Sequence, residues 1–160
     1  MDCLELRLSE IVRVALYTAA DTTVSIPANI NAPFIPAAYL SLPASPVIAL
    51  ALSPSSDTEA MLDATPSLKV TNALSPAGNI YTHELQLSVA QNPTTVRDAV
   101  DALVGRDFHI LYSLADGSQA LSYALPNTSL LSIEDNLSTT SLTTLKAHLS
   151  SMSNVIPLTT

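Results

Sequence analysis

The feature that most limits the possible folds is a nine-residue alternation of polar and less polar side chains between Tyr81 and Val89. Tyrosine, leucine, valine and His83 occupy every second position, and Thr, Glu, Gln and Ser fill the positions between them. Side chains of a β-strand point alternately to its two faces, so a period of two predicts a strand with one buried face. This segment is the clearest strand in the sequence.

After this strand the period changes to that of a helix. The apolar residues that fall on one helical stripe are Val96, Ala99, Val100, Leu103 and Val104. This spacing predicts one short helix over about residues 94–104. Thr95 is placed to cap its start, with Asp98 near the exposed amides of the first turn, and Gly105 can adopt the left-handed conformation that ends a helix.

A β-hairpin is expected after the helix, because Asp116 and Gly117 form the residue pair best suited to a two-residue type I′ turn. Pairing outward from this turn sets Tyr112 opposite Leu121, Ile110 opposite Tyr123 and Phe108 opposite Leu125. The large side chains of the hairpin would then share one face, and a shift of one residue would separate them.

Further strands are predicted by shorter apolar or alternating segments, in the ranges 4–8, 12–16, 37–42, 47–52, 129–133, 145–149 and 155–158. Eight of the eleven prolines lie in the first 76 residues, so the segment 20–76 is expected to be rich in loops, with strands that end at prolines. Within it, residues 53–66 are expected to form a loop. Further along, residues 134–140 are expected to form a polar turn.

Together these elements predict a mainly β protein with one short helix. Because one helix cannot cover both faces of a sheet, we expect an antiparallel β-sandwich or a partly closed barrel, with the helix of residues 94–104 flanking the sheets and plugging an open edge or end. A length of 160 residues is close to the usual size of one domain, so residues 1–160 are expected to form a single domain. Its best-defined part is the segment 78–158.

The composition predicts a folded protein whose surface is largely covered by neighbours. Hydrophobic residues make up 48% of the chain, too many for a disordered protein, whereas charged residues make up only 12% and leave few groups to solvate an isolated surface. The net charge of −8 opposes binding to nucleic acid, which needs Lys and Arg to neutralise phosphates. An acidic surface is compatible with a surface along which DNA passes without binding.

The cysteine content and the amino-terminal sequence favour the cytoplasm as the site of synthesis. A single cysteine, Cys3, cannot form an internal disulfide or a cysteine-based metal site. The opening residues MDCLELRLSE have neither the basic region nor the continuous apolar stretch of a signal peptide, and no apolar run approaches the ~20 residues that cross a bilayer. We therefore expect no export signal and no membrane association.

The histidines and the motif content do not predict a catalytic centre. The sequence has three histidines and no HExxH, GxSxG, paired-cysteine or calcium-loop motif. His83 lies on the apolar side of its strand, where a packed histidine bonded to the backbone is expected. His109 and His148 lie on the opposite faces of their strands from the large apolar residues, so they are expected at the surface or in contacts.

Acidic and glycine residues also fit structural positions better than binding sites. Asp57, Glu59 and Asp63 could attract a cation, but a solvated loop is the interpretation that we favour. The glycines have backbone roles: Gly78 fits a turn, Gly105 a helix end and Gly117 the hairpin. We therefore predict no catalytic, cofactor-binding or metal-binding residue, no cofactor and no enzyme activity.

The second half of the chain resembles a group of virion proteins. The resemblance is carried by G-N-I-Y-x-x-E-L-x-L-x-V from Gly78, F-H-I-L-Y-x-x-x-D-G from Phe108 and L-x-x-x-L-S-S-M-S-x-x-I-P-L from Leu145, with the short helix between the first two. These runs are similar to small structural proteins from the virion-assembly modules of tailed phages and prophages of gut bacteria. The resemblance implies a tail-tube or connector-like subunit, in which a β-sandwich with one flanking helix assembles into rings. Such proteins often have Asn-Gly at the hairpin, where this chain has Asp116 and Gly117.

We therefore expect a virion structural protein of a tailed phage, made in the host cytoplasm and located in the tail or neck. It would associate with itself in rings around the DNA passage and with other virion proteins, and bind neither a membrane nor a specific nucleic acid sequence. A capsid-decorating virion protein is one alternative. A non-viral β-sandwich for binding or adhesion is another, although five scattered Tyr and no Trp make an aromatic platform hard to build.

Overall fold

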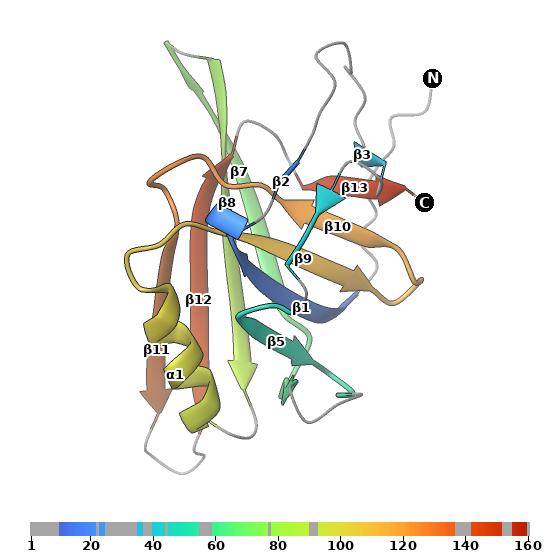
Figure 1. Ribbon diagram of the computed structural model, residues 1–160, viewed down its shortest axis with the longest axis vertical. Helices are drawn as coiled ribbons and strands as arrows, with labels where there is room; N and C mark the ends of the chain where they lie inside the picture. Colours follow the sequence, from blue (N-terminus) through green and yellow to red (C-terminus); the bar gives the residue numbers. More distant parts are fainter. Residues whose placement is uncertain are drawn as a thin grey trace.

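A computed structural model describes residues 10–21, 23–24, 35–36, 40–43, 45–54, 59–76, 78–89, 93–136, 142–151 and 155–159 of the chain. Two β-sheets pack against each other, and one short helix lies beside them (Figure 1). The expectation of a mainly β, sandwich-like fold with one flanking helix is therefore confirmed.

The larger sheet has seven strands. In spatial order they are β3 (Ile35–Pro36), β13 (Ile156–Thr159), β10 (Gln119–Ser122), β9 (Phe108–Leu114), β1 (Ile11–Thr18), β5 (Ile48–Ala51) and β6 (Ala60–Met61). Its central strands are antiparallel. The two short pairs at its ends, β13 with β3 and β5 with β6, are parallel, so the expectation of a wholly antiparallel sandwich needs this correction.

The smaller sheet has four strands, and all of them are antiparallel. In spatial order they are β11 (Leu130–Asn136), β12 (Leu142–Ser151), β8 (Gly78–Val89) and β7 (Ser67–Ser75). The strands of the larger sheet run across those of the smaller one (Figure 1). A separate pair joins β2 (Thr23–Val24) to β4 (Leu40–Ser41), and a short 3-10 helix (Ala19–Asp21) follows β1.

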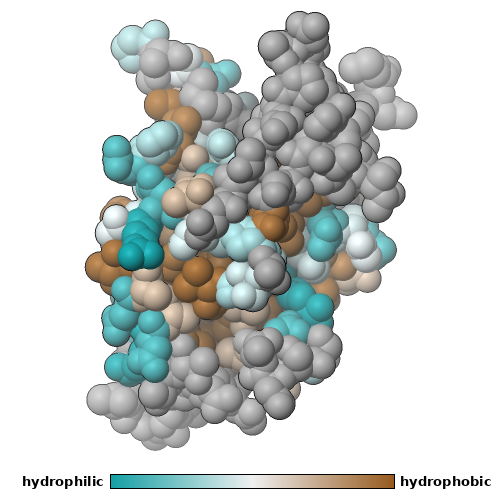
Figure 2. Space-filling model, in the orientation of Figure 1, coloured by the Kyte–Doolittle hydropathy of each residue, from teal (hydrophilic) through white to brown (hydrophobic). Residues whose placement is uncertain are grey.

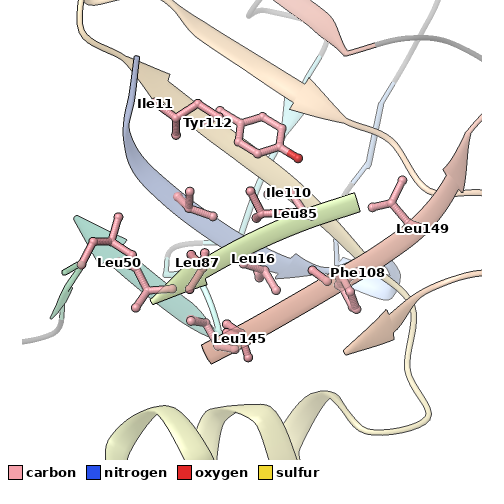
Figure 3. Close-up of a cluster of buried hydrophobic side chains, with 14 of the residues drawn as sticks. Ile11, Leu16, Leu50, Leu85, Leu87, Phe108, Ile110, Tyr112, Leu145 and Leu149 are labelled. Atoms are coloured by element: carbon pink, nitrogen blue, oxygen red, sulfur yellow. The ribbon is translucent and has the colours of Figure 1, made fainter. Parts of the chain in front are cut away.

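Alternate side chains of the two sheets form one core between them. Leu85 and Leu87 of β8 and Leu145 of β12 point into this core, as the period-two pattern predicts. They meet Phe108 and Tyr112 of β9, both of which are completely buried (Figure 3). Removing one large apolar side chain from water contributes about 1.5–3 kcal/mol, so this layer of side chains holds the sheets together.

The helix α1 (Pro93–Leu103) fills the space beside the core. Its stripe residues Val96, Val100 and Leu103 are buried in the same cluster as the two sheets. The helix lies against β11, the edge strand of the smaller sheet, and against β5, which is next to the edge of the larger one. The expected position of the helix at an open side of the sandwich is therefore confirmed.

The ends of the helix differ from the prediction in two details. The helix begins at Pro93, whose fixed φ suits the first helical position, so Thr95 lies inside the first turn and is not the cap. It ends at Leu103, and Gly105 has a φ of 74°, the left-handed conformation that was expected there. Val104 therefore lies beyond the helix and is 65% exposed, although the pattern placed it on the buried stripe.

The hairpin of β9 and β10 forms at Asp116 and Gly117, but with a different turn. Gly117 N–H donates to the Leu114 carbonyl (3.0 Å), and Leu114 N–H donates to the Ser118 carbonyl (2.9 Å), which leaves three residues in the loop. The φ of Gly117 is 89°, whereas that of Asp116 is not positive. These features describe a type I turn followed by a glycine bulge rather than the predicted type I′ turn.

The extra loop residue shifts the hairpin register by one. Tyr112 lies opposite Ala120, and Leu111 lies opposite Leu121. The prediction that all large side chains share one face is therefore wrong. Those of the second face form their own cluster, made of Ala15, Leu111 and Leu121 with Tyr17, Leu42, Tyr123 and Leu158 packed against it. The central part of the larger sheet is consequently buried on both faces.

The remaining expectations for the strands are met in part. Strand β5 forms within its predicted range, β4 lies within 37–42, and β1, β11, β12 and β13 overlap their predicted ranges but extend beyond them. Residues 53–66 contain β6 and are not only a loop. β11 continues to Asn136, into the segment 134–140 that was expected to turn. The range 4–8 lies outside the described residues.

Candidate functional site

A buried chain of hydrogen bonds joins the two sheets through Ser122. Its Oγ lies 2.8 Å from His83 Nδ1 and 2.8 Å from Tyr112 Oη, and all three residues are completely buried. His83 belongs to β8 of the smaller sheet, whereas the other two residues belong to β10 and β9 of the larger sheet. One hydroxyl can satisfy both bonds, because it accepts a hydrogen bond from one neighbour and donates one to the other.

This cluster contains a serine and a histidine, the residue types of a nucleophile and a base, but a substrate cannot reach them. Burial raises the pKa of Tyr112 well above its usual range, and the hydrogen bond to Ser122 offsets only part of that rise, so the phenol stays protonated. A completely buried serine cannot contact a substrate in the folded protein. We therefore interpret the cluster as a polar connection between the sheets. The buried position expected for His83 is confirmed, and the partner at its Nδ1 is a side-chain hydroxyl.

His109 is also buried, whereas its strand pattern predicted a position at the surface or in contacts. Its exposed fraction is 3%, its Nδ1 accepts a hydrogen bond from Ala124 N–H (3.0 Å), and its ring stacks on Tyr123 with centroids 4.3 Å apart. The surface expectation is wrong because the face of β9 that points away from the main core is covered as well. Burial lowers the pKa of His109 to about 4, although Asp107 acts in the opposite direction. The imidazole is therefore neutral at pH 7.

The outer face of the smaller sheet forms an open polar groove of about 720 Å³. The residues that give it its chemical character are Lys69, Glu84, Gln86, Leu130, Lys146 and His148. Both lysines of the chain therefore lie in this groove. Lys146 Nζ lies 3.4 Å from Glu134 Oε1, an exposed ion pair that contributes little to stability.

His148 lies near the middle of this groove. It belongs to β12, between Glu84 of β8 and Leu130 of β11. The residue is half-buried on the polar face of its sheet, as expected. Its Nδ1 is buried and has no hydrogen-bond partner among the described residues. None of the described residues that line the groove is a Phe, Tyr or Trp, so it does not offer the stacking platform that sugars prefer.

Of the acidic residues considered as a cation site, the structure describes Glu59 and Asp63. Glu59 Oε2 lies 3.0 Å from Arg13 Nε, Asp63 is exposed, and Asp57 lies outside the described residues. In the part of the chain that the structure describes, no group of three or more potential metal ligands occurs. Among the same residues, no helix is long and apolar enough to cross a bilayer.

The open edge of β7 is the most exposed structural feature. β7 is nine residues long and pairs with β8 on one side, and no described strand pairs with its other side. Residues 71–74 are all exposed, and the exposed fraction of Leu74 reaches 88%. Lys69 is the one charged residue of the strand. This edge therefore presents a long backbone surface with little charge.

β7 and β8 extend beyond the rest of the sheet as a two-stranded arm (Figure 1). β12 accompanies β8 only as far as Tyr81, which lies opposite Ser151. The turn of the arm is tight, since Ser75 pairs with Gly78, whose φ is 117°. The turn expected at Gly78 is confirmed. In the upper left of Figure 2, hydrophobic residues lie among polar ones on this arm.

β7 was not among the predicted strands, although the sequence contains a signal for it. Leu68 and Val70 alternate with Lys69 and Thr71, and the turn residues 76–78 connect this segment to the clear strand β8. The alternation is short and lies in the proline-rich segment, which was expected to form loops. Treating residues 76–78 as a hairpin turn would have assigned β7 as the partner of β8.

Comparisons with known proteins do not assign the chain to a family. No protein-family model, no curated protein and no solved structure matches it. The candidate functional surface is therefore defined by geometry, as the open edge and arm of β7 together with the polar groove beside them.

Proposed function

We propose that this chain is a structural subunit of a tailed-phage virion, located in the tail or neck, whose copies assemble into rings around the DNA passage. The observation that carries this proposal is the open edge of β7 with its arm. An edge strand offers unpaired N–H and C=O groups to another strand, and soluble proteins usually protect such edges. A long edge with one charge fits another protein chain better than it fits a small molecule.

The fold and the charge are consistent with this role. The segment 78–158, which resembles tail-tube and connector proteins, forms β8, α1 and β9 to β13 and contributes to both sheets. The net charge of −8 favours a surface that DNA passes without binding. Among the described residues, the cluster that combines a serine, a histidine and a tyrosine is completely buried and cannot meet a substrate.

Assembly can be tested by size-exclusion chromatography with light scattering, followed by negative-stain electron microscopy. We expect species of higher mass whose fraction grows with protein concentration, and ring-shaped particles among them. A protein that remains monomeric at high concentration, and is not recruited into particles by other tail or neck proteins, would contradict the proposal.

The polar groove of the smaller sheet favours a second candidate function, a β-sandwich binding module. Its volume of about 720 Å³ is within the range of ligand sites, and two lysines and a histidine line it. Screening the purified protein against carbohydrates and acidic peptides separates the two candidates. Saturable binding by a protein that stays monomeric, weakened by Lys69→Ala, would favour the binding module over the assembly subunit.

A capsid-decorating protein is a further version of the virion role and would use the same exposed edge. Labelling intact particles with an antibody against the chain distinguishes the locations. Label on the tail or neck is the expected result, and label over the capsid surface would favour the decorating role.

A further inference from the structure

The two sheets have four edges in the described structure, and three of these edges are protected. β3 and β6, at the two ends of the larger sheet, are strands of only two residues each. At β11, one edge of the smaller sheet, the helix α1 lies against the strand. Very short edge strands and covering helices are common means of preventing sheets from pairing edge to edge. Within the described residues, β7 is long and has neither protection.

We propose that β7 pairs antiparallel with β7 of a second copy of the chain, about a two-fold axis. This inference rests on the proposed function, in which copies associate, and it specifies one of the contacts. The pairing would join two four-stranded sheets into one continuous sheet. A two-fold contact uses the same surface on both copies and closes on itself. It therefore joins copies in pairs and leaves the rest of the surface for contacts that close a ring.

Full overlap of the nine residues of β7 fixes the register of this pairing. Ser67 then lies opposite the partner's Ser75, and Thr71 lies on the axis opposite its own counterpart. Lys69 lies opposite the partner's Ala73. The faces of the two sheets are continuous, because the axis of an antiparallel pair is normal to the sheet.

This register explains the positions of the exposed Leu74 and of Lys69, the one charged residue of β7. Leu74 is 88% exposed in the single chain. The pairing places it opposite the partner's Leu68, and Leu68 packs against the core in each copy. Cross-strand apolar pairs stabilise a sheet, whereas like charges directly opposite each other destabilise it. Lys69 meets an alanine, so the one charge of the strand does not oppose itself.

Cysteine cross-linking tests the position of the axis. Residues opposite each other in an antiparallel pair have Cα atoms ~4.5–5.5 Å apart, within the range that a disulfide spans. Thr71→Cys in a Cys3→Ser background should therefore form disulfide-linked dimers under mild oxidation. The control is Ser132→Cys in the same background, because Ser132 is also an exposed hydroxyl residue, on the opposite edge strand of the same sheet. It should not cross-link.

Charge substitutions at Ala73 test the register independently. Ala73 is exposed, so its replacement does not disturb the core. Each dimer would contain two contacts between position 73 and Lys69. Ala73→Lys should raise the dimer dissociation constant roughly fivefold and Ala73→Glu should lower it by a similar factor. Sedimentation velocity measures both, far-UV circular dichroism checks that each variant is folded, and Ser132→Lys and Ser132→Glu are the controls.

The outcomes separate this inference from the proposed function. Cross-linking at position 71 and opposite effects of the two charges at position 73 would support the two-fold β7 contact. Self-association without cross-linking and without charge effects would mean that the contact lies elsewhere, which overturns this inference and leaves the proposed function standing. A chain that is monomeric at every concentration would overturn this inference, and it would overturn the proposed function as well if other tail or neck proteins do not recruit it into particles.

Discussion

Replacing Ser122 by alanine is expected to destabilise the fold far more than the loss of one oxygen atom suggests. Ser122 Oγ is the shared partner of His83 Nδ1 and Tyr112 Oη, and all three residues are completely buried. The substitution removes a hydrogen bond from both groups at once. Each buried polar group left without its partner costs about 1–3 kcal/mol, so the two together cost about 2–6 kcal/mol. Because a domain is stable by only about 5–15 kcal/mol, this is a large fraction of the total.

Urea unfolding followed by circular dichroism measures this loss. Ser132→Ala is the matched control, since Ser132 is exposed and its replacement should change the free energy of unfolding by less than about 0.5 kcal/mol. In a Tyr112→Phe background, Ser122→Ala should cost less, because only His83 then loses a partner. We expect a coupling energy of about 1–2 kcal/mol from this double-mutant cycle. A Ser122→Ala protein as stable as the Ser132→Ala control would show that the Ser122 hydroxyl does not stabilise the fold.

Three further predictions concern acid stability, the hairpin turn and DNA. Burial lowers the pKa of His109 from 6.5 to about 4. As the pH falls, the imidazole of the unfolded chain is therefore protonated before that of the folded protein, and the free energy of unfolding should fall by up to about 3 kcal/mol between pH 6.5 and pH 4. Urea midpoints across this window should change less in His109→Gln than in the wild type. Gly117→Ala should lower the free energy of unfolding by about 1 kcal/mol, because the φ of 89° strains an alanine although no atom lies near its Cβ. In the same unfolding assay, Gly117→Asn should lower it by less. Duplex DNA should show no mobility shift with the protein at low salt. A clear shift would count against the interpretation that DNA passes the acidic surface without binding.

The elements that depend on local spacing were predictable from the sequence. The buried side of β8 and the helical stripe with Val96, Val100 and Leu103 follow from periods of two and 3.6 residues, which hold whatever packs against them. The position of the hairpin was predictable from a local residue pair, Asp116 and Gly117. Its register was not, because Asp116 and Gly117 suit both a two-residue turn and a three-residue turn with a glycine bulge, and the choice between them moves every side chain of β10 to the other face.

The positions that depend on distant contacts were not predictable. His109 alternates with large apolar residues, which normally places a residue in solvent, but Tyr123 and the second apolar cluster cover that face. The hydrogen bonds of Ser122 to His83 and Tyr112 join strands from different sheets, and no local pattern contains them. The open edge of β7 is likewise a property of the strand order, because an edge exists only where no neighbouring strand lies.

Amide hydrogen exchange at low and high protein concentration tests whether copies of this chain associate through the open edge of β7. In a single chain the outward amides of β7 face solvent and should exchange fast, whereas those of β9 in the interior of the larger sheet are paired on both sides. We expect β7 amides to become protected as the concentration rises, whereas β9 amides should not change. Exchange in β7 that is independent of concentration, in a sample where the protein associates, would contradict association through this edge.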